Sequence, residues 1–372
     1  MPNNQQVFLE FVRAGLWENG LVNDSRLMVH DYSSVEWEEV YRLASEQSVL
    51  GVVLAGIETN SLRPPQKLLL QWIGEVQMLE QQNKAMNQFI AKLVGKMREA
   101  DIYTLLVKGQ GVAQCYERPL WRTSGDVDLL LDEENYEKAK ALLIPIADEV
   151  HGEDVGRKHQ GLVIKGFNVE LHGRMPFGLS KKVDGVLDEV IDKANTDYTD
   201  GKDDLQGVAI PRPDEHVLIV FTHFLHHFFL EGVGLRQICD WCRLLWRYRS
   251  ELDLRLLEQR IRKAGLMSEW RAFAALAVDY LGMPVEAMPM YDARFTVKGK
   301  KILKRVLKCG NFGHNNDLSY RSKYTGMKYK VVATWRRFMG FASLVPVFPL
   351  DAPRFFVGYL LGKKMQFTGE TI

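Results

Sequence analysis

The residues best suited to chemistry are the acidic side chains of the stretch Gly-Asp-Val-Asp-Leu-Leu-Leu that begins at Gly125. Asp126 and Asp128 stand one residue apart in a segment that is otherwise apolar, which predicts a buried β-strand. Because side chains alternate between the two faces of a strand, both carboxylates point to the same face. Two like charges this close repel one another unless a cation lies between them or one carboxyl is protonated. The spacing therefore favours a divalent cation that takes hard oxygen ligands, Mg²⁺ or Mn²⁺.

A third carboxylate follows in the next apolar segments. Residues 159–172 are predicted to form two strands joined by a turn at Gly166 and Phe167. Glu170 and His172 in the second of these strands share one face. If this strand lies beside the first acidic strand, Glu170 completes a two-metal site. The alternative is that Glu170 is a strand-end residue that faces water.

A candidate phosphate-binding turn precedes the acidic strand. A short apolar strand is predicted at residues 103–107, and it is followed by Lys108, Gly109, Gln110 and Gly111 and then by a helix. A strand, a glycine-containing turn and a helix N-terminus together offer backbone N–H groups and the helix dipole to a phosphate. The order of these elements therefore predicts a nucleotide phosphate close to the acidic strand.

Taken together, these motifs resemble the uncharacterised nucleotidyltransferase family of the DNA polymerase β-like superfamily. The resemblance rests on Leu-Val-Lys-Gly, on an arginine four residues before Asp-Val-Asp, and on Val-Glu-Leu-His, and it covers residues 103–175. It implies that Asp126, Asp128 and Glu170 are the catalytic metal ligands. It also implies that the nucleotide is bound by Lys108, Gly109, Gln110, Gly111 and Arg122.

The resemblance implies transfer of a nucleoside monophosphate from a nucleoside triphosphate, such as ATP, to an acceptor hydroxyl by a two-metal mechanism. The acceptor stays open among a sugar, a small alcohol, a protein side chain and RNA. The usual Gly-Ser turn of the superfamily reads Gly109-Gln110 here, and the gap from this turn to Asp126 is longer than is common. The alternative function is a nucleotide-binding protein of the same fold without turnover. Gln110 favours this alternative, whereas the intact carboxylate trio opposes it.

Composition is that of an ordinary globular protein. The chain has 372 residues, of which 46% are hydrophobic and 26% charged, and its formal net charge is +1. Bulk electrostatics therefore require no polyanionic partner. Residues 1–6 contain no basic segment ahead of an apolar core, and no apolar run reaches the roughly 20 residues that a membrane span requires. We therefore expect a cytoplasmic protein.

The predicted fold class is α+β, a small mixed β-sheet flanked by helical regions. The expected division is a helical N-terminal region at residues 1–100, a nucleotidyltransferase-like core at 101–212, and a helical C-terminal domain with a basic-aromatic tail at 213–372. Apolar residues recur three and four apart over residues 66–100, which predicts one long helix that packs on the core. A further helix is predicted over residues 133–146 with an acidic first turn.

Two other groups of residues have metal-like spacing. His223 and His227 lie four apart in a predicted helix, but the glutamate of an H-E-x-x-H motif is missing, so we expect a packed or substrate-facing role. Arg236 and Asp240 have the same spacing and are expected to pair. The chain has too few and too scattered cysteines for a disulfide framework, and its C-x-x-C motif lies in a helical pattern without a second pair. Its members, Cys239 and Cys242, are expected to be buried helix residues.

The C-terminal tail is strongly basic. Between Lys298 and Arg337 there are twelve Lys or Arg residues and one acid, Asp317. Aromatic and apolar segments interrupted by proline follow at residues 338–350 and 354–364. Such a tail fits a helical extension docked on the body with its basic face in water, or peripheral contact with an anionic membrane. Nucleic acid or another polyanion is a further, less favoured partner.

Overall fold

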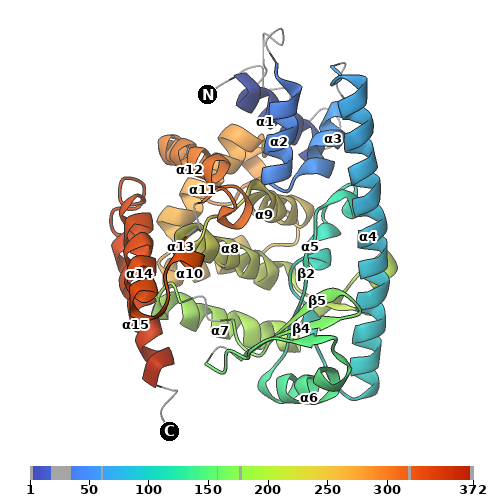
Figure 1. Ribbon diagram of the computed structural model, residues 1–372, viewed down its shortest axis with the longest axis vertical. Coiled ribbons are helices and arrows are strands. Elements are labelled where there is room, and N and C mark those ends of the chain that lie inside the picture. Colours follow the sequence, from blue (N-terminus) through green and yellow to red (C-terminus); the bar gives the residue numbers. More distant parts are fainter. Residues whose placement is uncertain are drawn as a thin grey trace.

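The small sheet lies beside α4 (Gln66–Glu99), which runs along one side of the molecule, and the C-terminal helices α14 (Gly326–Ala342) and α15 (Asp351–Thr368) lie at the opposite side (Figure 1). This arrangement confirms the predicted α+β class. The computed structural model describes most of the chain, namely residues 3–17, 35–59, 62–156, 158–175, 178–316 and 320–368.

The central sheet is mixed and, within the described residues, has five strands in the order β1-β2-β5-β4-β3. β2 and β5 are parallel neighbours, and the other pairs are antiparallel. The parallel pairing places Asp128 directly opposite Glu170. Two short strands, β6 and β7, form a separate antiparallel pair. The strands are β1 Leu105–Leu106, β2 Asp126–Leu130, β3 Glu149–Val150, β4 His159–Ile164, β5 Phe167–His172, β6 Tyr198–Asp200 and β7 Ala209–Pro211.

The hairpin between β4 and β5 turns at Lys165 and Gly166, whereas Phe167 already belongs to β5. Both turn residues have positive φ, 52° for Lys165 and 76° for Gly166. A two-residue hairpin turn of this kind matches the twist of the strands, and glycine reaches its backbone conformation without strain. The turn therefore lies one residue earlier than the sequence predicts, and the strands on either side are as expected.

One face of the sheet packs on α4 (Gln66–Glu99) and α6 (Glu133–Leu143). The odd-numbered residues of β2, Val127 and Leu129, are fully buried in this core. Phe89 of α4 stacks on Phe167 of β5 with ring centroids 4.7 Å apart. Since side chains alternate along a strand, Asp126 and Asp128 must point to the other face. The apolar half of the strand thus fixes the direction of its carboxylates.

A second hydrophobic core joins helices from both ends of the chain. Trp17, just after α1, donates its indole N–H to the carbonyl of Leu281 at 2.6 Å. The division of the chain at residues 1–100, 101–212 and 213–372 stays a prediction. The helices of this core include α1 Asn3–Leu16, α2 Trp37–Glu46, α3 Leu50–Thr59, α7 Lys181–Thr196, α8 Pro213–Leu230, α9 Leu235–Arg247, α10 Leu254–Ala264, α11 Met267–Leu281 and α12 Thr296–Cys309.

The remaining helices are shorter or lie toward the C-terminus. Cys239 and Cys242 are buried in α9, as the sequence predicts, and burial raises the pKa of both thiols. Within the described residues, every helix falls short of the length or the apolarity needed to cross a bilayer. The remaining helices are α5 Gln110–Ala113, α13 Tyr320–Lys323, α14 Gly326–Ala342 and α15 Asp351–Thr368. The 3₁₀ turns are η2 Pro119–Trp121, η3 Ile144–Ile146, η4 Asp203–Leu205, η5 Val285–Ala287, η6 Ala293–Phe295 and η7 Asn311–Gly313.

Candidate active site

A cleft of about 270 Å³ opens between the sheet and helices α8 and α9. Asp126 and Asp128 of β2 and Glu170 of β5 line one wall of this cleft. The structure thus brings together the carboxylates that the sequence singled out, because parallel pairing places their strands side by side. Their role as metal ligands stays a prediction.

Asp126 is the carboxylate most open to the cleft. It lies at the exposed start of β2, whereas Asp128 is only 5% exposed. Partial burial of its carboxyl raises the pKa of Asp126, and the negative charges of Asp128 and Glu170 raise it further. This repulsion is the cost that a divalent cation between the carboxylates would remove.

Asp128 is held as an anion by two neighbours. Its Oδ1 lies 2.6 Å from Nζ of Lys108 and 3.0 Å from Nε2 of His172. Burial raises the pKa of Asp128, but the lysine charge and the His172 hydrogen bond outweigh burial and hold the pKa below its ordinary value. Lys108, predicted from the turn motif, therefore reaches the acidic strand directly.

Glu170 lies between two imidazoles. Its Oε2 is 3.3 Å from Nε2 of His172 and 3.4 Å from Nε2 of His159. Burial acts to raise the pKa of Glu170, but hydrogen bonds from His159 and His172 hold it well below the ordinary value. Conversely, burial acts to lower the pKa of His172, and its bonds to Asp128 and Glu170 raise it overall.

The glycine turn packs directly against the acidic strand. Gly109 has φ +52°, and a Cβ at this position would lie 2.9 Å from the carbonyl oxygen of Asp126. The N–H of Gly111 donates to the carbonyl of Lys108 at 2.9 Å. The helix that follows, α5, has only four residues, so its dipole contributes little. Contact between this turn and a nucleotide phosphate stays a prediction.

Gln110 makes a structural contact with α4. Its side chain is 2% exposed, and its Nε2 donates to Oδ1 of Asn83 at 2.8 Å. Asn83 in turn donates from Nδ2 to the carbonyls of Leu120 and Arg122, each at 2.8 Å. Gln110, which stands where the resemblance leads one to expect a serine, therefore supports the loop before β2. Its side chain offers that hydrogen bond to Asn83 and not to a phosphate.

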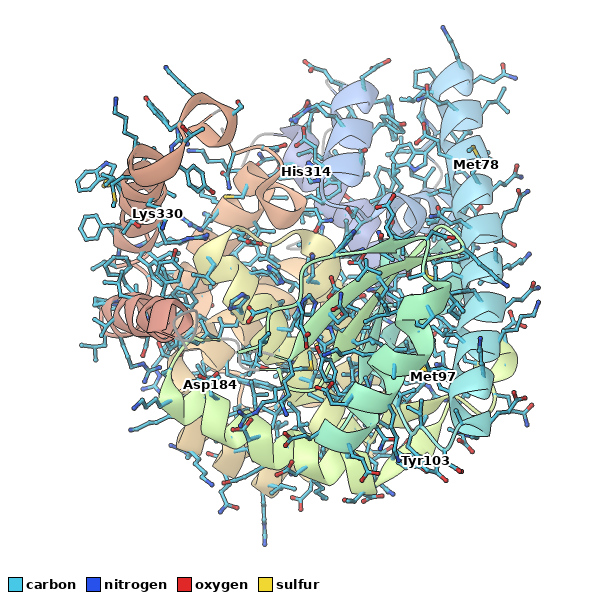
Figure 2. All side chains as sticks on the ribbon, turned by 60° about the horizontal axis from the view of Figure 1, so that its bottom comes forward. Met78, Met97, Tyr103, Asp184, His314 and Lys330 are labelled. Carbon is cyan, nitrogen blue, oxygen red and sulfur yellow. The ribbon has the colours of Figure 1, made fainter. Side chains whose placement is uncertain are left out.

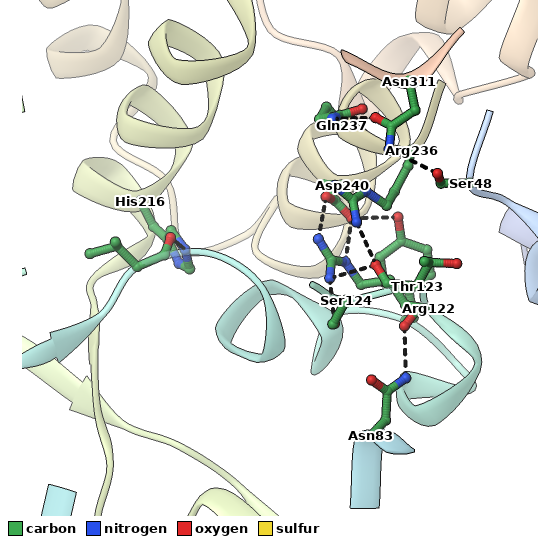
Figure 3. Close-up of polar contacts among 12 residues, drawn as sticks. Ser48, Asn83, Arg122, Thr123, Ser124, His216, Arg236, Gln237, Asp240 and Asn311 are labelled. Atoms are coloured by element: carbon green, nitrogen blue, oxygen red, sulfur yellow. Dashed lines mark hydrogen bonds and ion pairs between the residues drawn. The ribbon is translucent and has the colours of Figure 1, made fainter. Parts of the chain in front are cut away.

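Arg122 makes a buried, bidentate ion pair with Asp240 of α9 (Figure 3). Its Nε and Nη2 each lie 2.7 Å from a carboxylate oxygen of Asp240, and Tyr116 donates to the same carboxylate at 2.8 Å. Arg236, which the sequence predicted to pair with Asp240, donates from Nη1 to the carbonyl of Thr123 at 2.9 Å. Arg122 therefore ties the loop before β2 to α9.

The wall opposite the carboxylates carries nitrogen groups from α8 and α9. His223, His227 and Arg236 all line the cleft. Nε2 of His223 lies 3.1 Å from Nζ of Lys108 and 3.2 Å from Nε2 of His227. The two histidines thus face the cleft, and the substrate-facing role expected from their spacing stays a prediction. Arg236 was missed as a site residue, because its position four before Asp240 also fits a simple helix-surface pair.

Burial lowers the pKa of the Arg236 guanidinium to about 10. The guanidinium is still cationic at neutral pH. It lies near enough to Asp126 for their charges to interact. One wall of the cleft thus carries the three carboxylates, and the opposite wall carries the cationic Arg236 together with a neutral His223, whose pKa is held well below its ordinary value by burial and by the charge of Lys108.

Carboxylates on adjacent strands of a small mixed sheet, beside a Lys-Gly turn, define a nucleotidyltransferase-like core. Residues 33–282 match the family described as uncharacterised nucleotidyltransferase, and the chain belongs to this family. The match extends well beyond the motif region and includes helices α8 to α11, of which α8 and α9 supply the second wall of the cleft. No significant match is found among curated proteins or among solved structures.

Proposed function

We propose that the protein transfers a nucleoside monophosphate from a nucleoside triphosphate to an acceptor hydroxyl in a metal-dependent reaction. The observation that carries this proposal is the set of carboxylates on the parallel strands β2 and β5, which face Arg236 across one cleft and lie beside Lys108. The crowding of these carboxylates supports a metal here: after burial, the charges of Asp128 and Glu170 raise the pKa of Asp126 further, and a divalent cation would relieve that repulsion.

Asp126, Asp128 and Glu170 would hold the ions, Mg²⁺ or Mn²⁺. When bound, the metal supplies charge stabilisation at the phosphate and at the attacking and leaving oxygens. Lys108 and Arg236 would neutralise phosphate charge from the cleft walls, and the backbone at Gly109 to Gly111 would contact the phosphates. Positioning and charge stabilisation carry such a reaction, so no nucleophilic side chain is required.

Arg122 has a different proposed role from the one that the resemblance implies. Its guanidinium hydrogen-bonds Asp240, Ser124 and the carbonyl of Thr123, and it is only 5% exposed. A group engaged in this way acts on the nucleotide mainly by positioning the loop that leads into β2. We therefore assign direct phosphate contact to Lys108 and Arg236.

Replacement of Glu170 by glutamine tests the catalytic role of the third carboxylate. Glu170→Gln is expected to retain nucleotide binding, which rests on Asp126, Asp128 and the cations Lys108 and Arg236. Transfer should fall by roughly 10²- to 10⁴-fold, about 3–5 kcal/mol, because the change removes one charged ligand of the metal that stabilises the transition state. The measurement is nucleotide affinity by calorimetry and transfer rate on one preparation.

The matched control is Glu134→Gln on α6, a carboxylate whose side chain is 77% exposed and does not line the cleft. This change should leave both quantities near wild type, because exposed substitutions usually alter stability by no more than about 0.5 kcal/mol. Equal transfer rates for wild type and Glu170→Gln would show that Glu170 is not required and that the site consists of Asp126 and Asp128.

A second candidate function is attachment to an anionic membrane surface through α14. Large apolar side chains at helical spacing are exposed along one face of this helix, and cationic residues such as Lys328 and Lys330 lie between them. Figure 2 shows side chains near Lys330 projecting from the edge of the molecule. An apolar face with flanking cations suits the interface of an anionic bilayer. The apolar residues are Met327, Val331, Trp335, Phe338 and Met339, each between 41% and 74% exposed.

This candidate predicts binding to vesicles that contain phosphatidylserine. Trp335→Ser combined with Met327→Ser should weaken binding roughly tenfold or more, since burial of each large apolar side chain contributes about 1.5–3 kcal/mol. Salt should weaken it further, because surface charges are screened beyond about 8 Å at physiological ionic strength. Met78→Ser on α4 is the control, since Met78 is also exposed, at 71%. Wild-type protein that stays unbound at low salt, or that prefers RNA to vesicles, would contradict the candidate.

A further inference from the structure

We propose that His159, Glu170 and His172 form a separate binding site for a transition-metal ion of the Zn²⁺ class, at the edge of the carboxylate cleft. Within the part of the chain that the structure describes, this trio is the group of His, Cys, Asp and Glu residues whose potential ligand atoms all lie within 4.8 Å of one another. The site shares Glu170 with the proposed nucleotidyl transfer, but it does not rest on that function.

The β4–β5 hairpin creates this cluster. His159 at the start of β4 lies directly opposite His172 at the end of β5, and their ring centroids are 4.9 Å apart. Glu170 precedes His172 by two residues, so both point to the same face. The tight turn at Lys165 and Gly166 fixes the register, and the register fixes which side chains meet.

The separations between ligand atoms suit a small tetrahedral ion. Oε2 of Glu170 lies 3.3 Å from Nε2 of His172 and 3.4 Å from Nε2 of His159. Bonds of about 2.0–2.1 Å to a tetrahedral Zn²⁺ place neighbouring ligand atoms about 3.3–3.4 Å apart. Two edges of the cluster therefore already have the required length.

The donor set also separates this site from the Asp126–Asp128 site. Two imidazole nitrogens and one carboxylate favour Zn²⁺ or Co²⁺, whereas Mg²⁺ and Mn²⁺ prefer oxygen ligands. A set of two histidines and one glutamate with a fourth position open is a known arrangement for Zn²⁺ in proteins. His172 is buried, while His159 and Glu170 are about one-third exposed, so an ion can enter from solvent.

Asp128 lies beside the cluster but is not one of its three proposed ligands. Its Oδ1 is 3.0 Å from Nε2 of His172 and 2.6 Å from Nζ of Lys108. An ion at the histidine site would replace the contact between His172 and the carboxylates by direct ligation. Loss of Asp126 would leave all of the transition-metal ligands in place, whereas loss of His159 would leave all of the proposed Mg²⁺ ligands in place.

The test is binding of Co²⁺ and Zn²⁺ to the full chain in the absence of nucleotide. Wild-type protein should bind one equivalent of Co²⁺ with the visible absorption of a low-symmetry site, and Zn²⁺ should displace it. His159→Ala should lower the affinity by tenfold or more while leaving Mg²⁺-dependent nucleotide binding near wild type. The control is His314→Ala, because His314 is exposed and lies away from the sheet (Figure 2).

Two results would overturn the proposal. The first is wild-type protein that shows no Co²⁺ absorption at micromolar metal, and the second is His159→Ala that binds Co²⁺ as wild type does. Asp126→Asn separates this site from the proposed function, because it should abolish Mg²⁺-dependent nucleotide binding and preserve the Co²⁺ spectrum. His159→Gln, which keeps a polar side chain of similar reach, guards against a folding defect and should also lose the spectrum.

Discussion

Asp126→Asn combined with Asp128→Asn is expected to abolish Mn²⁺ binding in the cleft, together with nucleotidyl transfer. The two changes remove the carboxylates that β2 presents to the cleft and leave Glu170 as the remaining acidic ligand there. Metal-based charge stabilisation supplies several kcal/mol in such reactions, so transfer should fall by roughly 10³-fold or more. Calorimetry with Mn²⁺ measures the binding, and labelled nucleotide measures the transfer.

The control for this double variant is Asp188→Asn combined with Asp192→Asn. Both of these aspartates lie on α7, and neither lines the cleft. The control changes the net charge by the same amount and should leave Mn²⁺ binding and transfer unaltered. Retention of Mn²⁺ binding by the Asp126–Asp128 variant, with its circular dichroism unchanged, would contradict the metal assignment.

The second large effect is expected at Asp240. Asp240→Asn should lower the free energy of unfolding by about 3–5 kcal/mol, because it leaves Arg122 as a buried charge without its counter-ion. Arg122 is 5% exposed and Asp240 accepts two of its hydrogen bonds, so water cannot easily replace the carboxylate. Urea denaturation of wild type and variant measures the difference.

A matched double replacement separates loss of charge balance from loss of packing. Arg122→Met combined with Asp240→Leu removes both charges and keeps much of the apolar volume. Replacing a buried ion pair by apolar groups is often neutral, so this variant should regain most of the lost stability. If the single variant unfolds at the same urea concentration as wild type, the pair does not hold the loop before β2 in place.

The faces to which the acidic side chains of β2 and β5 point could be predicted from the sequence, because they depend only on the alternation of side chains along each strand. Asp126 and Asp128 had to share a face, and Glu170 and His172 likewise, whatever lay around them. The apolar residues between them then decided which face was buried. The long helix over residues 66–100 followed from the same kind of reasoning, and α4 covers Gln66–Glu99.

Contacts between distant elements could not be predicted in this way. Arg122 and Asp240 are 118 residues apart, and the local sequence around either residue does not indicate that the two pair. The spacing of Arg236 and Asp240 instead favoured a pair within α9. The role of Gln110 was predicted from its place in the turn, where the resemblance leads one to expect a serine. Its contact with Asn83 depends instead on where α4 crosses the turn. Local spacing shows which residues share a face, but not which element covers that face.

His159 illustrates the same limit within the site. Its place at the start of β4 was predicted, but its distance from Glu170 depends on the hairpin register. The register follows from the turn at Lys165 and Gly166, which the sequence placed one residue too late. A shift of one residue in an antiparallel hairpin changes which side chains meet, so the cluster became visible only in the structure.

The most direct test of the central claim compares ATP labelled at the α-phosphate with ATP labelled at the γ-phosphate. Each is incubated with the protein, Mg²⁺ and a cell extract that supplies acceptors. Nucleotidyl transfer predicts that wild-type protein adds the α-label to an acceptor beyond the level of the extract alone while the γ-label leaves as pyrophosphate, and that the Asp126–Asp128 variant adds no α-label beyond that level. Addition of the γ-label to an acceptor by wild type beyond the level of the extract alone, or equal incorporation of the α-label by wild type and variant, would contradict the account.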